Sequence, residues 1–408
     1  MSKKGFFTSS TPALKPVKIS GDNCFLCGLY KGCNSPKMLA TGDGSKGILV
    51  IAEAPGKTED EQGVQLVGEA GQLLRAKLSK YGVDLDKDCI KTNSIQCRPP
   101  KNRTPTDKEI EYCRPRVWDV IKETKPKVIL LLGGPALESF LGHRWKDPLG
   151  GITSWRGFTI PDRDTGAWVI PTFHPSYVNR TSKQPVVELI FEQDIKKAID
   201  TVDVPFPVYE DETKQVQIIN REEEITQEIS NMFQRYDKTQ LVAFDYETTG
   251  LKPQIEGHRI VCMSICYRDD VAFSFMLPDK ETQAFRYIKR FLQDKSIKKT
   301  GHNIKFEDTW TQVILGFPVK GWEWCSMQAA HIQDNRPGIV GLKLQTYLNF
   351  GVMGYDDIIG PYLKGRNKKD GANGFNNIDK APKDELLLYC GKDSLFQWRL
   401  AMKQRELI

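Results

Sequence analysis

Residues 48–55 read ILVIAEAP, an apolar run that ends in a polar turn containing proline. A short apolar run without alternation indicates a strand that is buried on both faces, as in a parallel sheet. The segments after it alternate between helix and strand: a helix from Gly71 to Tyr81, CIKTNSIQC (89–97), a helix from Thr106 to Thr124, VILLLG (128–133), WVIPTFHP, and a helix at 186–202. This order predicts an α/β fold for the first half, with a mostly parallel sheet covered by helices on both faces.

The length of 408 residues suggests two or three domains. Residues 203–215 are rich in Pro and acidic residues and show no period, so we predict a linker there between domains at 1–202 and 216–408. In the second half, the segments LVAFDYETTG, RIVCMSICY and VAFSFMLP predict a meander of strands followed by helices.

The composition, with 39% hydrophobic and 27% charged residues, is that of a globular protein and excludes a disordered or fibrous one. The net charge of +6 permits an acidic partner without demonstrating one. No apolar run reaches the ~20 residues of a membrane helix, and the N-terminus lacks the apolar core of a signal peptide. We therefore expect a cytoplasmic protein that does not cross a membrane.

Five of the ten cysteines lie before residue 100, and four cysteines have spacings typical of metal ligands. Cys24 and Cys27 form a C-x2-C pair, and fifteen residues separate Cys97 from Cys113. A reducing compartment disfavours disulfides, and thiolate ligands suit zinc or an iron-sulfur cluster. The spacing leaves zinc and a cluster equally open.

A series of short motifs surrounds these cysteines in a fixed order. They are Glu53-Ala54-Pro55-Gly56, Glu59-Asp60, Gln62-Gly63, Val67-Gly68, Ala70-Gly71-Gln72-Leu73-Leu74, Thr92-Asn93, Cys97-Arg98-Pro99-Pro100, Asn102-Arg103-Thr104-Pro105, Pro126-Lys127-Val128-Ile129 and His174-Pro175-Ser176. This series resembles the family-four uracil-DNA glycosylases, which carry a 4Fe-4S cluster. The resemblance implies a parallel-sheet α/β/α domain that acts on uracil-containing DNA, with Cys24, Cys27, Cys97 and Cys113 as the cluster ligands.

Excision of uracil requires that the base is flipped out of the helix, that its Watson-Crick edge is read, and that negative charge on the leaving ring is stabilised. The resemblance makes Asn93 the uracil reader, since its amide both donates and accepts hydrogen bonds. It makes His174 the donor to the developing oxyanion, and either Glu53 or Glu59 the group that positions water or balances the cationic sugar. The remaining predicted binding residues are Pro55, Gly56 and Ser176.

Two positions depart from the family pattern. Gln65-Leu66 stands where the family has Pro-Phe, so Leu66 lacks the ring that stacks on the flipped base. Stacking is worth about 1–3 kcal/mol per base, so we expect uracil affinity to be lower by about one to two decades. Glu69 replaces an Arg that can contact phosphate. The alternative hypothesis is therefore an N-terminal domain that binds DNA or assists assembly without catalysis.

The second half carries three groups of candidate catalytic residues. Asp245 and Glu247 are two residues apart, so on a strand they point to the same side and can share a divalent ion. Tyr389 and Asp393 are one helical turn apart. The segment GHNIKFED (301–308) lies between these two groups.

Together the three groups resemble the tyrosine-containing branch of the DEDD exonuclease superfamily, and most closely the proofreading domain of family A DNA polymerases. The resemblance implies a ribonuclease H-like domain with a mixed sheet, which cuts single-stranded DNA from the 3′ end. In that scheme Asp245, Glu247 and Asp393 bind two Mg²⁺ ions, with Mn²⁺ as a substitute, and Tyr389 orients the attacking water.

The middle motif, GHNIKFED (301–308), departs from the family pattern in its acidic residue. Counting from Asn303, which we place among the substrate-binding residues, the family's Asp falls on Glu307, and Asp308 follows it. A neighbouring helical residue is rotated by about 100°, so we favour Glu307 as the catalytic carboxylate and keep Asp308 as the second choice.

Both halves in this order resemble the N-terminal part of some phage family A DNA polymerases. We therefore expect phage-type DNA replication or repair in a bacterial or phage-infected cell, with DNA as the substrate. A DNA polymerase domain is the expected partner, in cis or in trans.

Overall fold

The computed structural model describes residues 24–408, and the chain divides into two compact units, Met1–Pro207 and Val208–Ile408. The start of the predicted first domain lies outside the described residues. The division falls within the stretch predicted as a linker, whose bounds stay a prediction. No helix in the described part of the chain is long and apolar enough to cross a membrane.

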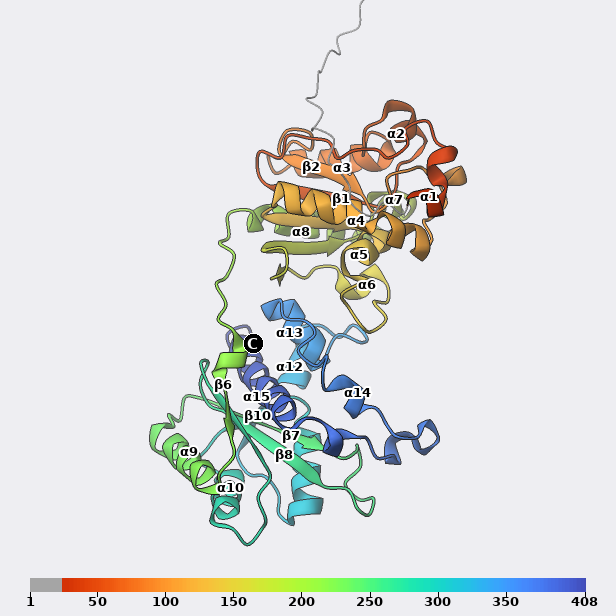
Figure 1. The fold of residues 1–408 in the computed structure, drawn as a ribbon. Coiled ribbons are helices and arrows are strands. Elements are labelled where there is room, and N and C mark those ends of the chain that lie inside the picture. The colour runs from red at the N-terminus through yellow and green to blue at the C-terminus, as the bar shows by residue number, and fades with distance from the viewer. Residues whose placement is uncertain (1–23) are drawn as a thin grey trace, which may run out of the picture. The chain divides into compact units, whose positions relative to one another are not determined.

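The first unit contains five strands and eight α-helices in its described part. The strands are β1 (Ile48–Ala52), β2 (Cys89–Asn93), β3 (Val128–Leu132), β4 (Ile160–Asp162) and β5 (Ala167–Thr172). Figure 1 labels the helices, which are α1 (Cys24–Cys27), α2 (Lys57–Gln62), α3 (Glu69–Ser79), α4 (Asp107–Thr124), α5 (Gly134–Leu141), α6 (Ile152–Trp155), α7 (Pro175–Arg180) and α8 (Pro185–Thr201).

The sheet of this unit has the strand order β2-β1-β3-β5-β4, and its first four strands are parallel. Side chains from α3 and α8 share one hydrophobic core with Ile48, Val50 and Leu130. The alternate residues of the strands point to the opposite face and are equally buried, and α5 packs against β1 and β3. Helices therefore cover both faces of the sheet.

The second unit has a six-stranded sheet. Its strands are β6 (Val216–Ile219), β7 (Val242–Thr248), β8 (Ile260–Cys266), β9 (Ala272–Met276), β10 (Lys299–Gly301) and β11 (Trp322–Cys325). Its helices are α9 (Glu222–Arg235), α10 (Gln283–Gln293), α11 (Ile304–Trp310), α12 (Ser326–Gln333), α13 (Leu342–Phe350), α14 (Gly360–Leu363) and α15 (Lys383–Arg405).

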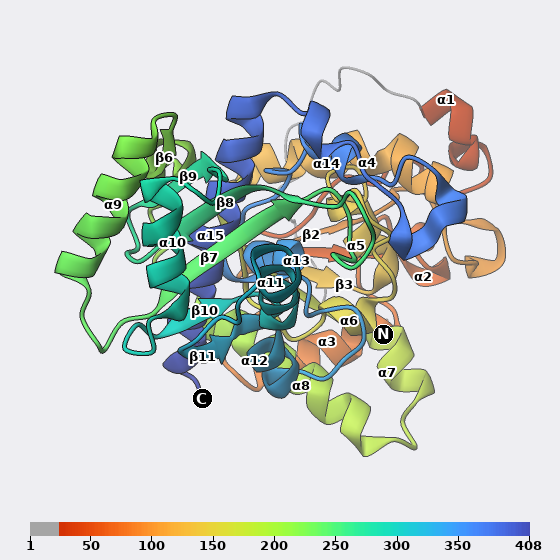
Figure 2. The same ribbon diagram turned by 90° about the horizontal axis from the view of Figure 1, so that it is seen from below.

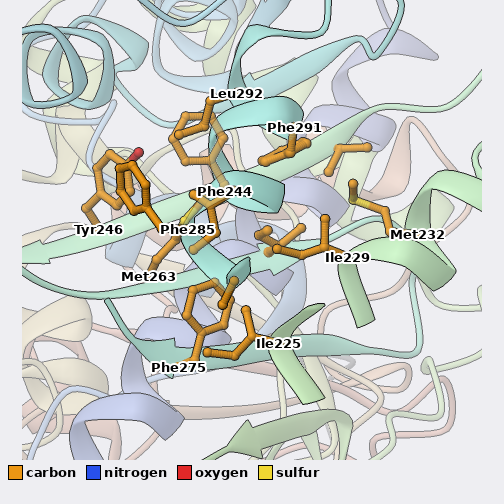
Figure 3. Close-up of a cluster of buried hydrophobic side chains, with 14 of the residues drawn as sticks. Ile225, Ile229, Met232, Phe244, Tyr246, Met263, Phe275, Phe285, Phe291 and Leu292 are labelled. Atoms are coloured by element: carbon orange, nitrogen blue, oxygen red, sulfur yellow. The ribbon is translucent and has the colours of Figure 1, made fainter. Parts of the chain in front are cut away.

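The strand order in this sheet is β11-β10-β7-β8-β9-β6, with antiparallel pairing at β7–β8 and β8–β9 and parallel pairing elsewhere. On one face, α9 and α10 lie side by side and bury residues such as Ile229 and Phe291 against Phe244 of β7 (Figures 2 and 3). On the other face, α15 packs along β7, β8 and β9. Asp245 and Glu247 alternate with Phe244 along β7, so they face α15.

A glycine lets α15 approach the sheet closely. A Cβ atom at Gly391 would lie 2.3 Å from Cγ1 of Val216 on β6, which is too close for any side chain. The close approach at Gly391 sets the part of α15 that also carries Tyr389 and Asp393 against the sheet.

The structure confirms the predicted fold classes, a mostly parallel sheet in the first unit and a mixed sheet in the second. The antiparallel edge strand β4 was not predicted, because its three residues include Pro161 and give no clear period.

Candidate active sites

A pocket of about 320 Å³ lies at the carboxyl ends of the parallel strands in the first unit. Glu53 follows β1, Asn93 ends β2, and His174 follows β5. Parallel α/β sheets bind their ligands at this edge. The lining includes every residue predicted for the uracil site: Glu53, Pro55, Gly56, Glu59, Leu66, Asn93, His174 and Ser176.

Asn93 presents an unpaired amide group to this pocket. Its side chain is buried, and its Nδ2 atom has no hydrogen-bond partner. A buried donor without a partner costs about 1–3 kcal/mol, so such groups are rare unless a ligand completes them. The β2 register opposite β1, with Asn93 beside Ala52, fixes the side chain at the strand end.

His174 is held as a neutral donor. The backbone N–H of Ser176 donates to Nδ1 of His174 at 3.2 Å, and the Ser176 hydroxyl lies 2.7 Å from the same atom. Since Nδ1 accepts, the ring proton belongs on Nε2. Burial, with a smaller contribution from the charge of Arg180, lowers the pKa of His174 to about 4. The ring therefore donates a hydrogen bond at neutral pH without carrying charge.

The two candidate carboxylates of the pocket differ in their surroundings. Burial raises the pKa of Glu53, while a hydrogen bond from Thr104 and the charge of Arg180 act in the opposite direction. Glu59 accepts a hydrogen bond at Oε1 from the Gly68 N–H at 2.8 Å. Glu59 therefore holds the loop before α3 through this hydrogen bond. Glu53 is a buried acid with a raised pKa, as is common for groups in acid–base catalysis.

Leu66 forms part of the pocket in a left-handed backbone conformation, with φ of 56°. Its neighbour Gln65 is buried, accepts a hydrogen bond from the Thr41 hydroxyl and donates one to the Leu39 carbonyl. A Cβ atom at Gly71 would lie 1.9 Å from the Leu66 carbonyl oxygen. Hydrogen bonds of Gln65 and close backbone packing at Gly71 thus hold the loop that bears Leu66.

The four predicted metal-ligating cysteines come from three elements. Cys24 and Cys27 are on α1, Cys113 is on α4, which packs against α1, and Cys97 follows β2. Burial raises the pKa of Cys97 and of Cys113 to about 12, and the charges of Cys24 and Cys27 add to the increase at Cys113. Ionised thiols are therefore costly here without a bound cation, and a metal centre would stabilise them.

One of these sulfurs accepts a hydrogen bond from the backbone. The Lys37 N–H donates to the Cys97 sulfur at 3.2 Å, an interaction that favours thiolate.

The second unit gathers carboxylates between β7 and α15. Ligand atoms of Asp245, Glu247 and Cys390 all lie within 4.8 Å of one another. Gln397 of α15 donates to Oδ1 of Asp245 at 2.7 Å and so fixes that carboxylate. Tyr389 and Asp393 project from the same helix and are buried. The charge of Asp393 acts on both Asp245 and Glu247, so the predicted carboxylates of the first and third motifs lie near one another.

Burial and mutual repulsion act on the carboxylates of this site. Burial, together with the charge of Asp393, raises the pKa of Asp245, and burial together with Asp245 raises the pKa of Glu247. Acids with raised pKa values in one buried group become fully ionised when divalent cations neutralise them. Hard oxygen ligands in this number fit Mg²⁺ or Mn²⁺.

Glu307 and Asp308 have different environments. Glu307 is buried, its Oε2 atom lacks a hydrogen-bond partner, and burial with the charge of Asp245 raises its pKa. Asp308 accepts hydrogen bonds from the Val319 N–H at 3.0 Å and from Gln312 at 2.5 Å. Asn303 precedes α11 in a left-handed conformation, with φ of 74°.

Sequence reasoning missed Lys343 and Tyr355 at this site, as well as Gln397 described above. Lys343 of α13 donates to Oδ1 of Asp393 at 2.6 Å, and the Tyr355 hydroxyl donates to the same oxygen at 2.6 Å. In the first unit it missed Thr104 and Arg180, which line the pocket. Those two stand within or beside motifs already recognised, whereas Lys343 and Tyr355 carry no local signal.

Comparisons with known proteins identify both halves of the chain. The uracil DNA glycosylase superfamily matches residues 40–199, and a 3′-5′ exonuclease family matches residues 220–407. The type-4 uracil-DNA glycosylase of Pyrobaculum aerophilum is 37% identical over 180 residues, 42% of this chain and 86% of that protein. The corresponding protein of Thermotoga maritima is 36% identical over 175 residues, 43% of this chain and 87% of that protein.

One relative matches almost the whole chain. The DNA polymerase of Bacillus phage SP01 is 24% identical over 409 residues, covering 93% of this chain but only 42% of that polymerase. Among solved structures, Brucella melitensis NrnC with bound Mg²⁺ gives a TM-score of 0.33 and 18% identity over 47% of this chain and 80% of that chain. The Trypanosoma brucei RNase D:GMP complex gives a TM-score of 0.36 and 17% identity over 47% of this chain and 57% of that chain.

Proposed function

Since the chain belongs to the type-4 uracil-DNA glycosylase family through its first half and carries a 3′-5′ exonuclease domain in its second, we propose that it combines uracil excision with Mg²⁺-dependent removal of 3′-terminal nucleotides from DNA. The observation that carries the exonuclease proposal is the buried group of Asp245, Glu247, Glu307 and Asp393. The observation that carries the glycosylase proposal is the unpaired amide of Asn93 in its pocket.

In the exonuclease site, Asp245, Glu247 and Asp393 would hold the divalent ions, with Glu307 beside them. Bound metal ions lower the pKa of water and stabilise the attacking and leaving oxygens of a phosphodiester. Tyr389 orients the attacking water through its hydroxyl, and Gln397 keeps Asp245 in position. The product is a nucleoside monophosphate released from the 3′ end.

Substitution of the metal ligands tests the exonuclease proposal. We expect Asp245→Ala or Asp393→Ala to lower the rate of Mg²⁺-dependent 3′-end degradation by about a hundredfold or more, because these ligands serve the transition state. DNA binding should be largely unchanged. The matched control is Glu281→Ala, which removes an exposed acid of the same unit. Equal rates for Asp245→Ala and Glu281→Ala would refute the proposal.

In the glycosylase pocket, Asn93 would hydrogen-bond the Watson-Crick edge of a flipped uracil. The Nε2–H group of His174 would donate to the uracil oxygen on which negative charge develops, and its neutrality allows this at physiological pH. Glu53 would position the attacking water or balance the cationic sugar. The cysteine centre, which we propose holds a 4Fe-4S cluster, would tie α1 to α4 beside this pocket.

Single-stranded DNA is the sharpest substrate for testing uracil excision, because no base has to be unstacked from a duplex. We expect slow but measurable release of uracil, and a higher rate in Leu66→Phe, which restores an aromatic face without changing the backbone conformation. Asn93→Ala should abolish release, whereas Asn179→Ala, an exposed residue on α7, should not. If neither wild type nor Leu66→Phe releases uracil at high enzyme excess, the proposal of uracil excision fails. The first domain would then be a DNA-binding module.

The match to a phage DNA polymerase motivates a further part of the proposal. We propose that the chain acts next to a DNA polymerase domain, in cis or in trans, where it removes mismatched 3′ ends. An exonuclease-deficient polymerase should extend a 3′-mismatched primer only when this protein and Mg²⁺ are added. The same mixture with Asp245→Ala should leave the primer unextended.

A further inference from the structure

Lys343 lies next to the exonuclease carboxylates and pairs with one of them, Asp393. Asp245, Glu247, Glu307 and Asp393 are all buried, and Lys343 contributes a positive charge that acts on both Asp245 and Glu247. The Lys343 side chain keeps 31% of its surface exposed, whereas that of Asp393 keeps 9%. The ammonium therefore reaches the buried acids from the solvent side.

Three groups fix the ammonium in place. It donates to Oδ1 of Asp393 at 2.6 Å and lies 3.9 Å from the ring centre of Tyr355 and 4.2 Å from that of Tyr389. Tyr355 donates to the same Asp393 oxygen. One oxygen of Asp393 is thus occupied by two donors, and only the other is open to a metal ion.

A single positive charge at this position opposes the binding of a doubly charged ion. Two like charges a few ångströms apart repel strongly even with the screening found near a protein surface. A DNA phosphate at the site has the opposite effect, because it attracts the ammonium away from Asp393. Lys343 is long and partly exposed, and Asp393 is its ion-pair partner, so it can exchange that partner for a phosphate.

We propose that Lys343 holds the place of a divalent ion at Asp393 until a negatively charged 3′-terminal phosphodiester enters, and so couples metal loading to substrate binding. The inference rests on the proposed exonuclease function. In the free protein the ammonium pairs with Oδ1 of Asp393, and in the complex it pairs with the phosphate, so that its charge leaves Asp393 and only the Tyr355 hydroxyl still donates to Oδ1. No bond to carbon or phosphorus changes in this exchange.

A structural role for the same ion pair predicts the opposite result. If Lys343 only oriented Asp393 as a ligand, its removal would weaken metal binding, as loss of an outer-shell partner commonly does. If Lys343 holds the place of the ion, its removal would strengthen metal binding in the absence of DNA. The sign of the change therefore separates the two roles.

The test measures Mn²⁺ binding by the electron paramagnetic resonance signal of the free ion, with the full chain and without DNA. We expect Lys343→Met to bind Mn²⁺ about tenfold more tightly than wild type, from the loss of one repulsive charge. Lys343→Arg should resemble wild type because it keeps the charge. Lys238→Met, which removes an exposed lysine elsewhere in the unit, should also resemble wild type.

The second arm adds a single-stranded oligonucleotide whose 3′-terminal linkage is a phosphorothioate, which is charged and slow to hydrolyse. It should raise the Mn²⁺ affinity of wild type about tenfold and that of Lys343→Met no more than about twofold, since binding couplings are reciprocal. An oligonucleotide with an uncharged methylphosphonate at that linkage should leave the wild-type affinity unchanged. An equal increase with both oligonucleotides would overturn the inference.

Weaker or unchanged Mn²⁺ binding by Lys343→Met without DNA would likewise overturn it. Failure of the proposed exonuclease function looks different: wild type would then bind Mn²⁺ with the expected coupling but degrade no DNA with Mg²⁺. The Mn²⁺-binding measurements require no DNA cleavage. Failure of the inference about Lys343 is therefore seen in metal binding, and failure of the exonuclease proposal is seen in the degradation assay.

Discussion

Glu307 and Asp308 are adjacent residues of the same charge in different surroundings. The sequence predicted Glu307 from its position after Asn303, but a count from one motif leaves a one-residue uncertainty. The structure separates them by their partners: Asp308 has two hydrogen bonds, and Glu307 has an unpaired oxygen near Asp245. Such partners come from residues such as Val319, whose approach no local pattern reveals.

The assignment of Glu307 leads to a prediction. We expect Glu307→Ala to lower the rate of 3′-end degradation by about a hundredfold, because it removes an acid from the metal site. Asp308→Ala should lower it by less than about fivefold, since that side chain accepts hydrogen bonds from the Val319 backbone and from Gln312. A gel assay with 5′-labelled oligonucleotides measures both rates. A larger loss in Asp308→Ala would show that the middle motif is shifted by one residue.

At the scale of elements, the helix α15 shows what periodicity predicts well. Tyr389, Asp393 and Gln397 are spaced by four residues, so they lie along one face of the helix, and that face meets β7. This spacing predicted that the first two residues share a helix face, and the resemblance to the DEDD exonucleases implied their roles. Lys343 was not predicted, because it lies on α13, and only tertiary folding brings α13 against α15.

The pairing of α1 with α4 leads to a prediction about the cysteine centre. If Cys24, Cys27, Cys97 and Cys113 hold a 4Fe-4S cluster, protein prepared without oxygen should be brown, with broad absorbance at about 400 nm. Cys97→Ala should lose this absorbance and its iron. Cys89→Ala is the control, because that buried thiol lies on β2 and belongs to the hydrophobic core. Stoichiometric zinc without iron would contradict the cluster.

At the scale of the molecule, the chain has two units with separate hydrophobic cores. The unbroken apolar runs of the first half predicted its parallel sheet, whereas the mixed sheet of the second half was implied by the resemblance to the DEDD exonucleases. The sequence did not predict how residues from distant segments meet, as Arg180 and Thr104 do at the glycosylase pocket. Those contacts depend on loop paths, for which the sequence carries no period.

The separate cores, together with the buried acids of the second unit, predict how stability depends on pH and metal. Burial raises the pKa of Asp245 to about 8. An unfolded Asp has a pKa of about 3.9, so the native state binds the extra proton between these values. The stability of the metal-free exonuclease unit therefore falls as pH rises through this window. Buried neutral histidines change the stability at lower pH. The pKa of His302 is about 4, so this residue lowers the stability only as the pH falls below its unfolded value of about 6.5.

We expect scanning calorimetry of the full chain to show two unfolding transitions. Mg²⁺ should raise the transition temperature of the exonuclease unit. At a hundred times its dissociation constant a ligand adds about 2.7 kcal/mol, or roughly 5–10 °C for a unit of this size. The increase should be larger at pH 8 than at pH 6, because metal binding must displace the protons held by the raised-pKa acids. Without metal at pH 8, Asp245→Asn should raise the transition temperature of the exonuclease unit, since it removes a repelling carboxylate. The same substitution should abolish the rise in transition temperature that Mg²⁺ causes. An increase that is equal at both pH values, or that persists in Asp245→Asn, would show that Mg²⁺ binds elsewhere.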